Sequence, residues 1–200
     1  MLIAFEGIDG SGKNTQIRKL ILFLRQNGIK YKLHKYPTKK AKDVFAHLKG
    51  KKSLSAEELA GVFAEDIMKQ QGSLRKELSA GYVVICDRYL HSTLAYQGAK
   101  IGYDEVKMII EAKPALTPDF VLVLDIDAWG GAKRKMGQKR PDRFEKDVKY
   151  LDAVRRNYLR EAKENFLAYK FEVLDGAKSA EEVFSEVVMH IEPLLTKKMK

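Results

Sequence analysis

Residues 7–15 read Gly-Ile-Asp-Gly-Ser-Gly-Lys-Asn-Thr, and this segment is the strongest indication of the fold class. It matches the phosphate-binding P-loop at every defined position except Asn14, where a Ser or Thr normally holds magnesium. An apolar run at residues 2–5 precedes it, and apolar residues recur at helical spacing over residues 17–24. Strand, loop and helix are the context that a P-loop requires, and a chance Gly/Ser surface turn lacks that context.

The loop predicts a site for the phosphates of ATP. Its glycines let the backbone turn with N–H groups pointing inward, the following helix offers its positive N-terminus, and Lys13 reaches the β- and γ-phosphates. The residues expected to bind ATP here are Gly7, Ile8, Asp9, Gly10, Ser11, Gly12, Lys13, Asn14 and Thr15. Asn14 is also a candidate magnesium ligand through its amide oxygen.

Length and composition narrow the class of protein. Two hundred residues suit a single domain over residues 1–200. No stretch approaches the roughly 18 consecutive apolar residues of a membrane span, and no signal-peptide pattern follows Met1, so we expect a cytoplasmic protein without a membrane partner. The only cysteine, Cys86, lies in an apolar run and excludes an intramolecular disulfide or a cysteine-based metal site.

The net charge of +10 is concentrated in the first half of the chain. Nine lysines and one acid, Asp43, lie between residues 30 and 52. Such a run is a candidate nucleic-acid footprint or a solvated face beside a phosphate site. No RNA-binding or helix-turn-helix motif accompanies it, which favours the solvated face and argues against nucleic acid as a partner.

Apolar, β-rich runs recur at residues 2–5, 31–36, 82–86, 120–124 and 171–174, with helix-like stretches between them. This alternation predicts an α/β fold of the P-loop NTPase type, with a parallel sheet between two layers of helices.

Local signals also predict where helices begin and end. Gly28 ends the first helix, Ser55 or Ser53 begins a helix through the late 70s, and Ser179 forms a capping box with Glu182. A long charged helix is expected from Glu145 to about residue 168. The Gly- and Lys/Arg-rich residues 129–143 predict a mobile basic lid.

The third predicted strand ends in Cys86-Asp87-Arg88-Tyr89, at the edge where parallel sheets bind ligands. Asp87 can hold the magnesium waters of a P-loop nucleotide, and Arg88 can bind a second phosphate. Taken alone, the tripeptide is better explained by an ordinary salt bridge at a strand end.

Its continuation, Asp-Arg-Tyr-Leu-His-Ser-Thr-Leu-Ala-Tyr-Gln-Gly over residues 87–98, closely resembles the signature of thymidylate kinases. Further segments match that family in its order, at residues 5–10, 36–38, 118–120, 124–127, 142–145 and 174–177. The resemblance implies a five-stranded parallel sheet of order 2-3-1-4-5 and transfer of the γ-phosphoryl of ATP to dTMP with Mg²⁺. It also implies a homodimer.

The resemblance assigns roles to individual residues. Asp9 would contact the sugar 3′-hydroxyl and Arg88 the acceptor phosphate, while Phe63 would stack on thymine. Phe144 would disfavour ribose, and Lys39 stands near a basic position after the second strand. The nucleoside pocket would be completed by Thr93, Tyr96 and Gln97.

The charges around the transferred phosphoryl depart from one group of the family. That group has an arginine at the position of Gly10, so here the charge is expected from the lid, with Arg140 and Arg143 as the leading candidates. Arg134 and Ala177 would complete the contacts with ATP. Because the acceptor phosphate is already ionised at pH 7, no general base is required, and Lys13, Arg88 and magnesium act by alignment and charge.

Ile67 keeps one alternative open. Four residues after its stacking aromatic the family has an arginine that hydrogen-bonds thymine O4, whereas this chain has Ile67. A kinase for another deoxynucleoside monophosphate, dUMP or dCMP, therefore remains an alternative. A nucleic-acid-binding protein that uses ATP as a switch is the alternative from a different class.

Overall fold

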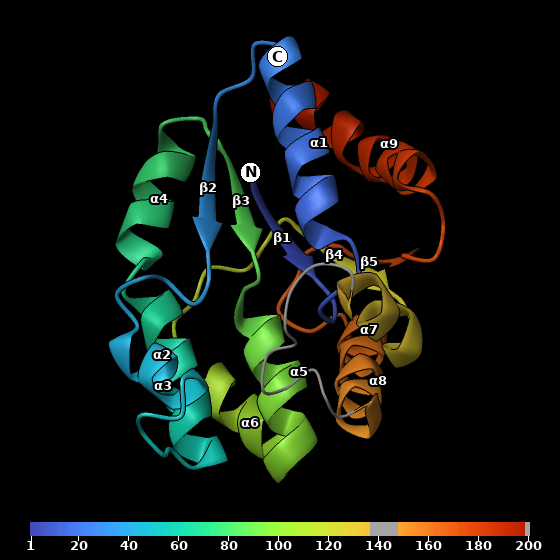
Figure 1. Cartoon of the computed structure of the whole chain (residues 1–200). Coiled ribbons are helices and arrows are strands. Elements are labelled where there is room, and N and C mark those ends of the chain that lie inside the picture. Colours follow the sequence, from blue (N-terminus) through green and yellow to red (C-terminus); the bar gives the residue numbers. More distant parts are fainter. Residues whose placement is uncertain (137–147, 199–200) are drawn as a thin grey trace.

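The computed structural model describes residues 1–136 and 148–198 (Figure 1). Its centre is a five-stranded sheet in which every neighbouring pair is parallel and the order is β2-β3-β1-β4-β5. The strands are β1 Leu2–Glu6, β2 Tyr31–Lys35, β3 Val83–Asp87, β4 Phe120–Asp125 and β5 Phe171–Asp175. The predicted P-loop NTPase-type α/β fold and its strand order are confirmed.

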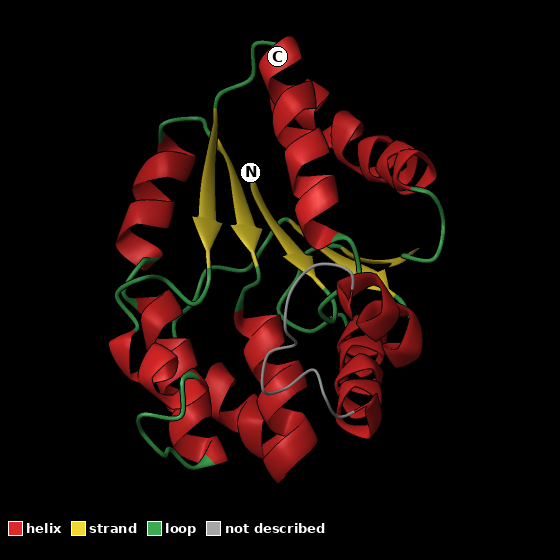
Figure 2. Cartoon of the chain, viewed as in Figure 1, coloured by secondary structure: helices red, strands yellow, loops and turns green. Residues whose placement is uncertain are grey.

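Helices cover both faces of this sheet (Figure 2). They are α1 Lys13–Gln26, α2 Lys42–Leu48, α3 Ala56–Met68, α4 Gln71–Ser79, α5 Leu90–Ile101, α6 Tyr103–Glu111, α7 Ala128–Met136, α8 Val148–Glu164 and α9 Ala180–Lys198. Among the described residues, no helix is both long enough and apolar enough to cross a bilayer.

Alternation along the strands builds two hydrophobic cores. Ile3 and Phe5 of β1 face one core, which they share with apolar residues of α1 and α9. Leu2 and Ala4 face the other, with residues of α3, α4, α5, α6 and α8. The central strands β1 and β3 are buried along their whole length, as expected for a parallel sheet covered on both sides.

Predicted helix ends are largely confirmed. Ser55 forms a capping box with Glu58 at the start of α3, and Ser179 forms one with Glu182 before α9. The helix predicted to run through the late 70s is instead two helices, α3 and α4. The side chain of Gln71 donates to the carbonyl of Ile67 and to Tyr89 Oη, so tertiary contacts hold the break between them.

Because all five strands run in the same direction, their carboxyl ends lie at one edge of the sheet. Each strand ends in a charged residue at the same edge of the sheet: Glu6, Lys35, Asp87, Asp125 and Asp175. The first part of the predicted lid, residues 129–136, belongs to α7, and its remainder lies outside the described residues.

Candidate active site

The P-loop leaves the end of β1 and enters α1 at Lys13. Gly7, Gly10 and Gly12 all have positive φ, at 128°, 82° and 99°, where a side chain would be strained. At Gly7 a Cβ would also lie 2.5 Å from the carbonyl oxygen of Leu124. The predicted phosphate-binding backbone therefore depends on glycine at these positions.

Lys13 lies inside this turn. Its Nζ donates to the carbonyls of Gly7 (2.8 Å) and Ile8 (2.9 Å) and lies 4.0 Å from the Asp9 carboxylate. Burial, followed by the charge of Arg88, lowers the pKa of Lys13 to about 7. A bound polyphosphate would favour the charged ammonium, because an opposite charge nearby stabilises the protonated form.

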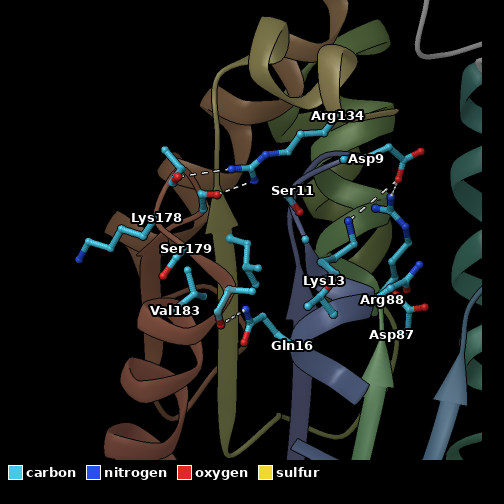
Figure 3. Close-up of a pocket in the computed structure, with 18 of the residues that line it drawn as sticks. Asp9, Ser11, Lys13, Gln16, Asp87, Arg88, Arg134, Lys178, Ser179 and Val183 are labelled. Atoms are coloured by element: carbon cyan, nitrogen blue, oxygen red, sulfur yellow. Dashed lines mark hydrogen bonds and ion pairs between the residues drawn. The ribbon is translucent and has the colours of Figure 1, made fainter. Parts of the chain in front are cut away.

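Arg88 follows β3 in a left-handed conformation, with φ 71°, which is uncommon for a residue other than glycine. Its guanidinium forms an ion pair with Asp9 (Figure 3). It also donates to Ser92 Oγ at 3.0 Å. It also lies 5.0 Å from the centre of the Tyr96 ring. The turn thus aims a cation at the P-loop.

Glu6, to which the sequence assigned no role, stabilises the turn that follows β3. Its carboxyl is fully buried and accepts hydrogen bonds from Tyr89 N (2.6 Å), Ser92 Oγ (2.5 Å) and Tyr158 Oη (3.0 Å). Burial raises the pKa of Glu6 above its usual value. An acid at the end of a wholly apolar strand was the available signal, whereas Tyr158 is 152 residues away and had none.

A cavity of about 640 Å³ opens over the P-loop. Seven of the nine predicted loop residues line it, from Asp9 to Thr15, while Gly7 and Ile8 contribute the carbonyls that hold Lys13. Arg134 of α7 and Ala177 also line it, and Arg134 donates to the carbonyl of Gly176 at 2.6 Å (Figure 3). The predicted ATP contacts in the described residues are therefore brought together.

Asn14 and Asp87, the two predicted magnesium residues, line this same cavity. Among the described residues there is no cluster of three His, Cys, Asp or Glu side chains that could hold a metal by itself. Mg²⁺ does not need one, because it retains several waters and uses one or two protein oxygens together with substrate phosphates. The amide of Asn14 and the carboxylate of Asp87 fit that donor set.

A second, smaller cavity of about 150 Å³ lies beside the first and is mostly apolar. Its lining includes the predicted pocket residues Phe63, Thr93, Tyr96 and Gln97. Tyr36 Oη and Gln97 Oε1 are buried here without a hydrogen-bond partner. Unsatisfied buried polar atoms in a mostly apolar pocket suit a ligand that combines apolar surface with a few polar groups.

The two cavities meet at Asp9 and Arg88, which line both. A group bound by the P-loop and a group bound in the apolar pocket would therefore approach each other at one acid and one arginine. This arrangement suits direct transfer between two bound substrates.

Other predicted residues are not brought to the site. Lys39 is exposed and lines neither cavity. Arg140, Arg143 and Phe144 lie outside the described residues.

His91 of the signature segment, to which no role was assigned, is fully buried. Burial lowers the pKa of His91 to about 4, so this side chain is neutral at physiological pH.

Comparison with known proteins gives consistent matches. The family model described as thymidylate kinase matches residues 5–187. A thymidylate kinase of Thermosipho melanesiensis is 35% identical over 204 residues, covering 98% of this chain and 99% of that protein. One of Fervidobacterium nodosum is 32% identical over 194 residues, covering 94% and 96% respectively. A probable thymidylate kinase of Thermococcus onnurineus is 34% identical over 209 residues, covering 99% and 100%. The similarity therefore spans both cavities and is not confined to the P-loop.

Proposed function

The chain belongs to the thymidylate kinase family, and we propose that it transfers the γ-phosphoryl group of ATP to dTMP, giving ADP and dTDP. The observation that carries this proposal is the meeting of the polyphosphate cavity and the apolar pocket at Asp9 and Arg88. One cavity suits the donor and the other a nucleoside.

The acceptor supplies its own nucleophile. An oxygen of the dTMP phosphate attacks the γ-phosphorus, and the bond to the β–γ bridging oxygen breaks, leaving ADP. That acceptor oxygen is already ionised at pH 7, so no side chain needs to remove a proton.

The protein acts by placing positive charge. Lys13 contacts the β- and γ-phosphates, and Arg88 holds the acceptor phosphate in line with them. Asp9, beside Arg88, binds the sugar 3′-hydroxyl. Asn14 and, through waters, Asp87 would hold Mg²⁺, which would supply further positive charge to the phosphates of ATP.

The remaining contacts divide between the two ends of the substrates. Arg134 and Ala177 bind the nucleoside end of ATP, while Phe63 stacks on the base of dTMP. The other residues that contact the nucleoside of dTMP are Thr93, Tyr96 and Gln97. The roles of Lys39, Arg140, Arg143 and Phe144 stay predictions, as do the single domain with its lid, the homodimer and the cytoplasmic location.

The proposal is tested by assaying dTMP, dUMP, dCMP, dGMP, dAMP and UMP as acceptors with ATP and Mg²⁺. We expect dTMP to be phosphorylated most efficiently. If another monophosphate is phosphorylated more efficiently, that monophosphate and not dTMP is the substrate. Tight, salt-dependent binding of random DNA without turnover of any monophosphate would overturn the proposal.

The charge roles have their own test. Lys13→Ala and Arg88→Ala should each lower kcat by about 10² or more, because each removes a cation from the transferring or accepting phosphate. Arg156→Ala is the matched control, since the Arg156 side chain on α8 is 69% exposed. Unchanged kcat in a folded Lys13 or Arg88 variant contradicts the role assigned to that residue.

A further inference from the structure

Lys35, which no step above uses, contacts the carboxylate assigned to the metal. It is the last residue of β2, and its Nζ lies 2.7 Å from Oδ2 of Asp87, the last residue of β3. Both side chains line the large cavity. The Asp87 side chain is 8% exposed and the Lys35 side chain 67% exposed, so the ion pair joins a buried acid to a solvent-exposed cation.

Strand pairing builds this contact. Lys35 is the register partner of Asp87 in the parallel β2–β3 ladder. The next amide along, that of Tyr36, donates to the backbone carbonyl of Asp87 at 3.1 Å. The two side chains therefore leave the same edge of the sheet from neighbouring, hydrogen-bonded backbone positions.

The ion pair changes the charge that an arriving metal meets. Among the described residues that line the cavity over the P-loop, only Asp9 and Asp87 have carboxylates. Asp9 is paired with Arg88 and lies 4.0 Å from Lys13, and Asp87 is paired with Lys35. A divalent cation arriving alone finds both acids neutralised, whereas one carried by a triphosphate brings its own negative charge.

We infer that Lys35 is a positioning residue of the donor site: it holds and neutralises Asp87 until a metal–nucleotide complex displaces it. The protein then takes up Mg²⁺ together with ATP in preference to Mg²⁺ alone. This inference rests on the proposed function, which places Asp87 on the metal side of the site.

Binding of Mn²⁺ to the nucleotide-free protein tests the inference. The free Mn²⁺ concentration is followed by electron spin resonance at low ionic strength. Lys35→Met should tighten Mn²⁺ binding by about fivefold, the upper end expected for an ion pair with one exposed partner. Lys35→Arg should restore the wild-type affinity. Lys32→Met, a matched charge removal on the same strand, should leave Mn²⁺ affinity unchanged.

The same measurement in an Asp87→Asn background tests whether the effect passes through Asp87. There Lys35→Met should have no effect, because the carboxylate for which the metal and the lysine compete is gone. An unchanged Mn²⁺ affinity in Lys35→Met, or an equal increase with Lys32→Met or in the Asp87→Asn background, overturns the inference. The Mn²⁺ measurement uses no acceptor, so the inference about Lys35 can fail while the acceptor assay supports the proposed function. The proposed function can likewise fail while Mn²⁺ binding behaves as expected.

Discussion

At the residue scale, Asn14 places a carboxamide where a P-loop normally presents a hydroxyl. It is the second residue of α1, exposed, and lines the large cavity. Its amide oxygen can meet a hard cation, but the side chain is longer than that of Ser or Thr and its NH₂ must point away. The position is therefore expected to bind Mg²⁺ less well than the usual residue.

We predict that Asn14→Thr lowers the Mg²⁺ concentration for half-maximal activity, because a hydroxyl fits the loop–metal distance better. Titration of kcat against free Mg²⁺ at saturating ATP and dTMP measures this. Asn14→Ser should behave alike. If both variants need more Mg²⁺ than the wild type, Asn14 is the better-fitted ligand.

Ile67 leaves the base end of the small cavity without a cation in the described residues. It lies on α3, is 2% exposed and lines this cavity with Phe63, one turn earlier. Recognition of thymine O4 therefore lacks the arginine that the family resemblance places at this position. A charged hydrogen bond to a base edge is typically worth about 1.5 to 3 kcal/mol.

We predict that dUMP is a measurable secondary substrate and that Ile67→Arg raises the preference for dTMP over dCMP by about tenfold or more. The N4 amine of dCMP would oppose the arginine donor. The ratio of kcat/KM for the two acceptors reports the effect, and circular dichroism checks that the variant is folded. A wild-type enzyme that already rejects both dUMP and dCMP would mean that another residue reads O4.

At the element scale, α7 packs directly on the P-loop through glycine. A Cβ on Gly131 would lie 2.8 Å from the carbonyl oxygen of Asp9 and 3.1 Å from Ile8 Cδ1. From the other side, a Cβ on Gly10 would collide with the Gly131 backbone. This contact gives a physical reason for glycine at position 10, where one group of the family has an arginine.

We predict that Gly131→Ala lowers kcat/KM for ATP several-fold, because the methyl group must push α7 or the loop at Asp9 out of position. Arg134 lies one turn further along α7 and would move with it. Gly72→Ala in α4 is the control: a Cβ there meets nothing within 4 Å, so kcat/KM for ATP should be unchanged. Wild-type kcat/KM in Gly131→Ala would show that α7 tolerates the shift.

At the scale of the whole molecule, the buried carboxyl group of Glu161 lowers the stability of the folded state. Glu161 of α8 is fully buried, and neither carboxyl oxygen has a hydrogen-bond partner. Burial raises its pKa well above the usual value, and the charges of Glu6 and Glu164 add to the effect. The folded protein therefore keeps this proton at pH values where the unfolded chain has lost it.

The sign of the pH dependence follows. A carboxyl whose pKa is raised by folding lowers folded stability as pH rises above its ordinary pKa of about 4.3. Each pKa unit of the shift costs about 1.4 kcal/mol at pH values above the folded pKa. We predict that Glu161→Gln increases the free energy of unfolding more at pH 8 than at pH 4.

Urea denaturation at the two pH values measures the difference. Glu111→Gln, at an exposed position in α6, is the matched control and should change stability little at either pH. Equal effects of Glu161→Gln at pH 4 and pH 8 would show that folding does not raise the pKa of Glu161.

Features that depend on neighbours along the chain could be predicted from the amino-acid sequence alone. The P-loop, the five strands and the capping box at Ser179 are short-range patterns, because backbone geometry, side-chain period and cap hydrogen bonds act over a few residues. The strand order came from the family resemblance, and the structure confirms it.

Only the tertiary structure decided which distant residues meet. Glu6 and Tyr158 share a hydrogen bond across 152 residues, and Lys35 reaches Asp87 through the register of two strands that are 52 residues apart. The break between α3 and α4 likewise depends on Gln71 reaching Tyr89 and residue 116. Such contacts are set by sheet order, register and packing, for which a local stretch of sequence carries no signal.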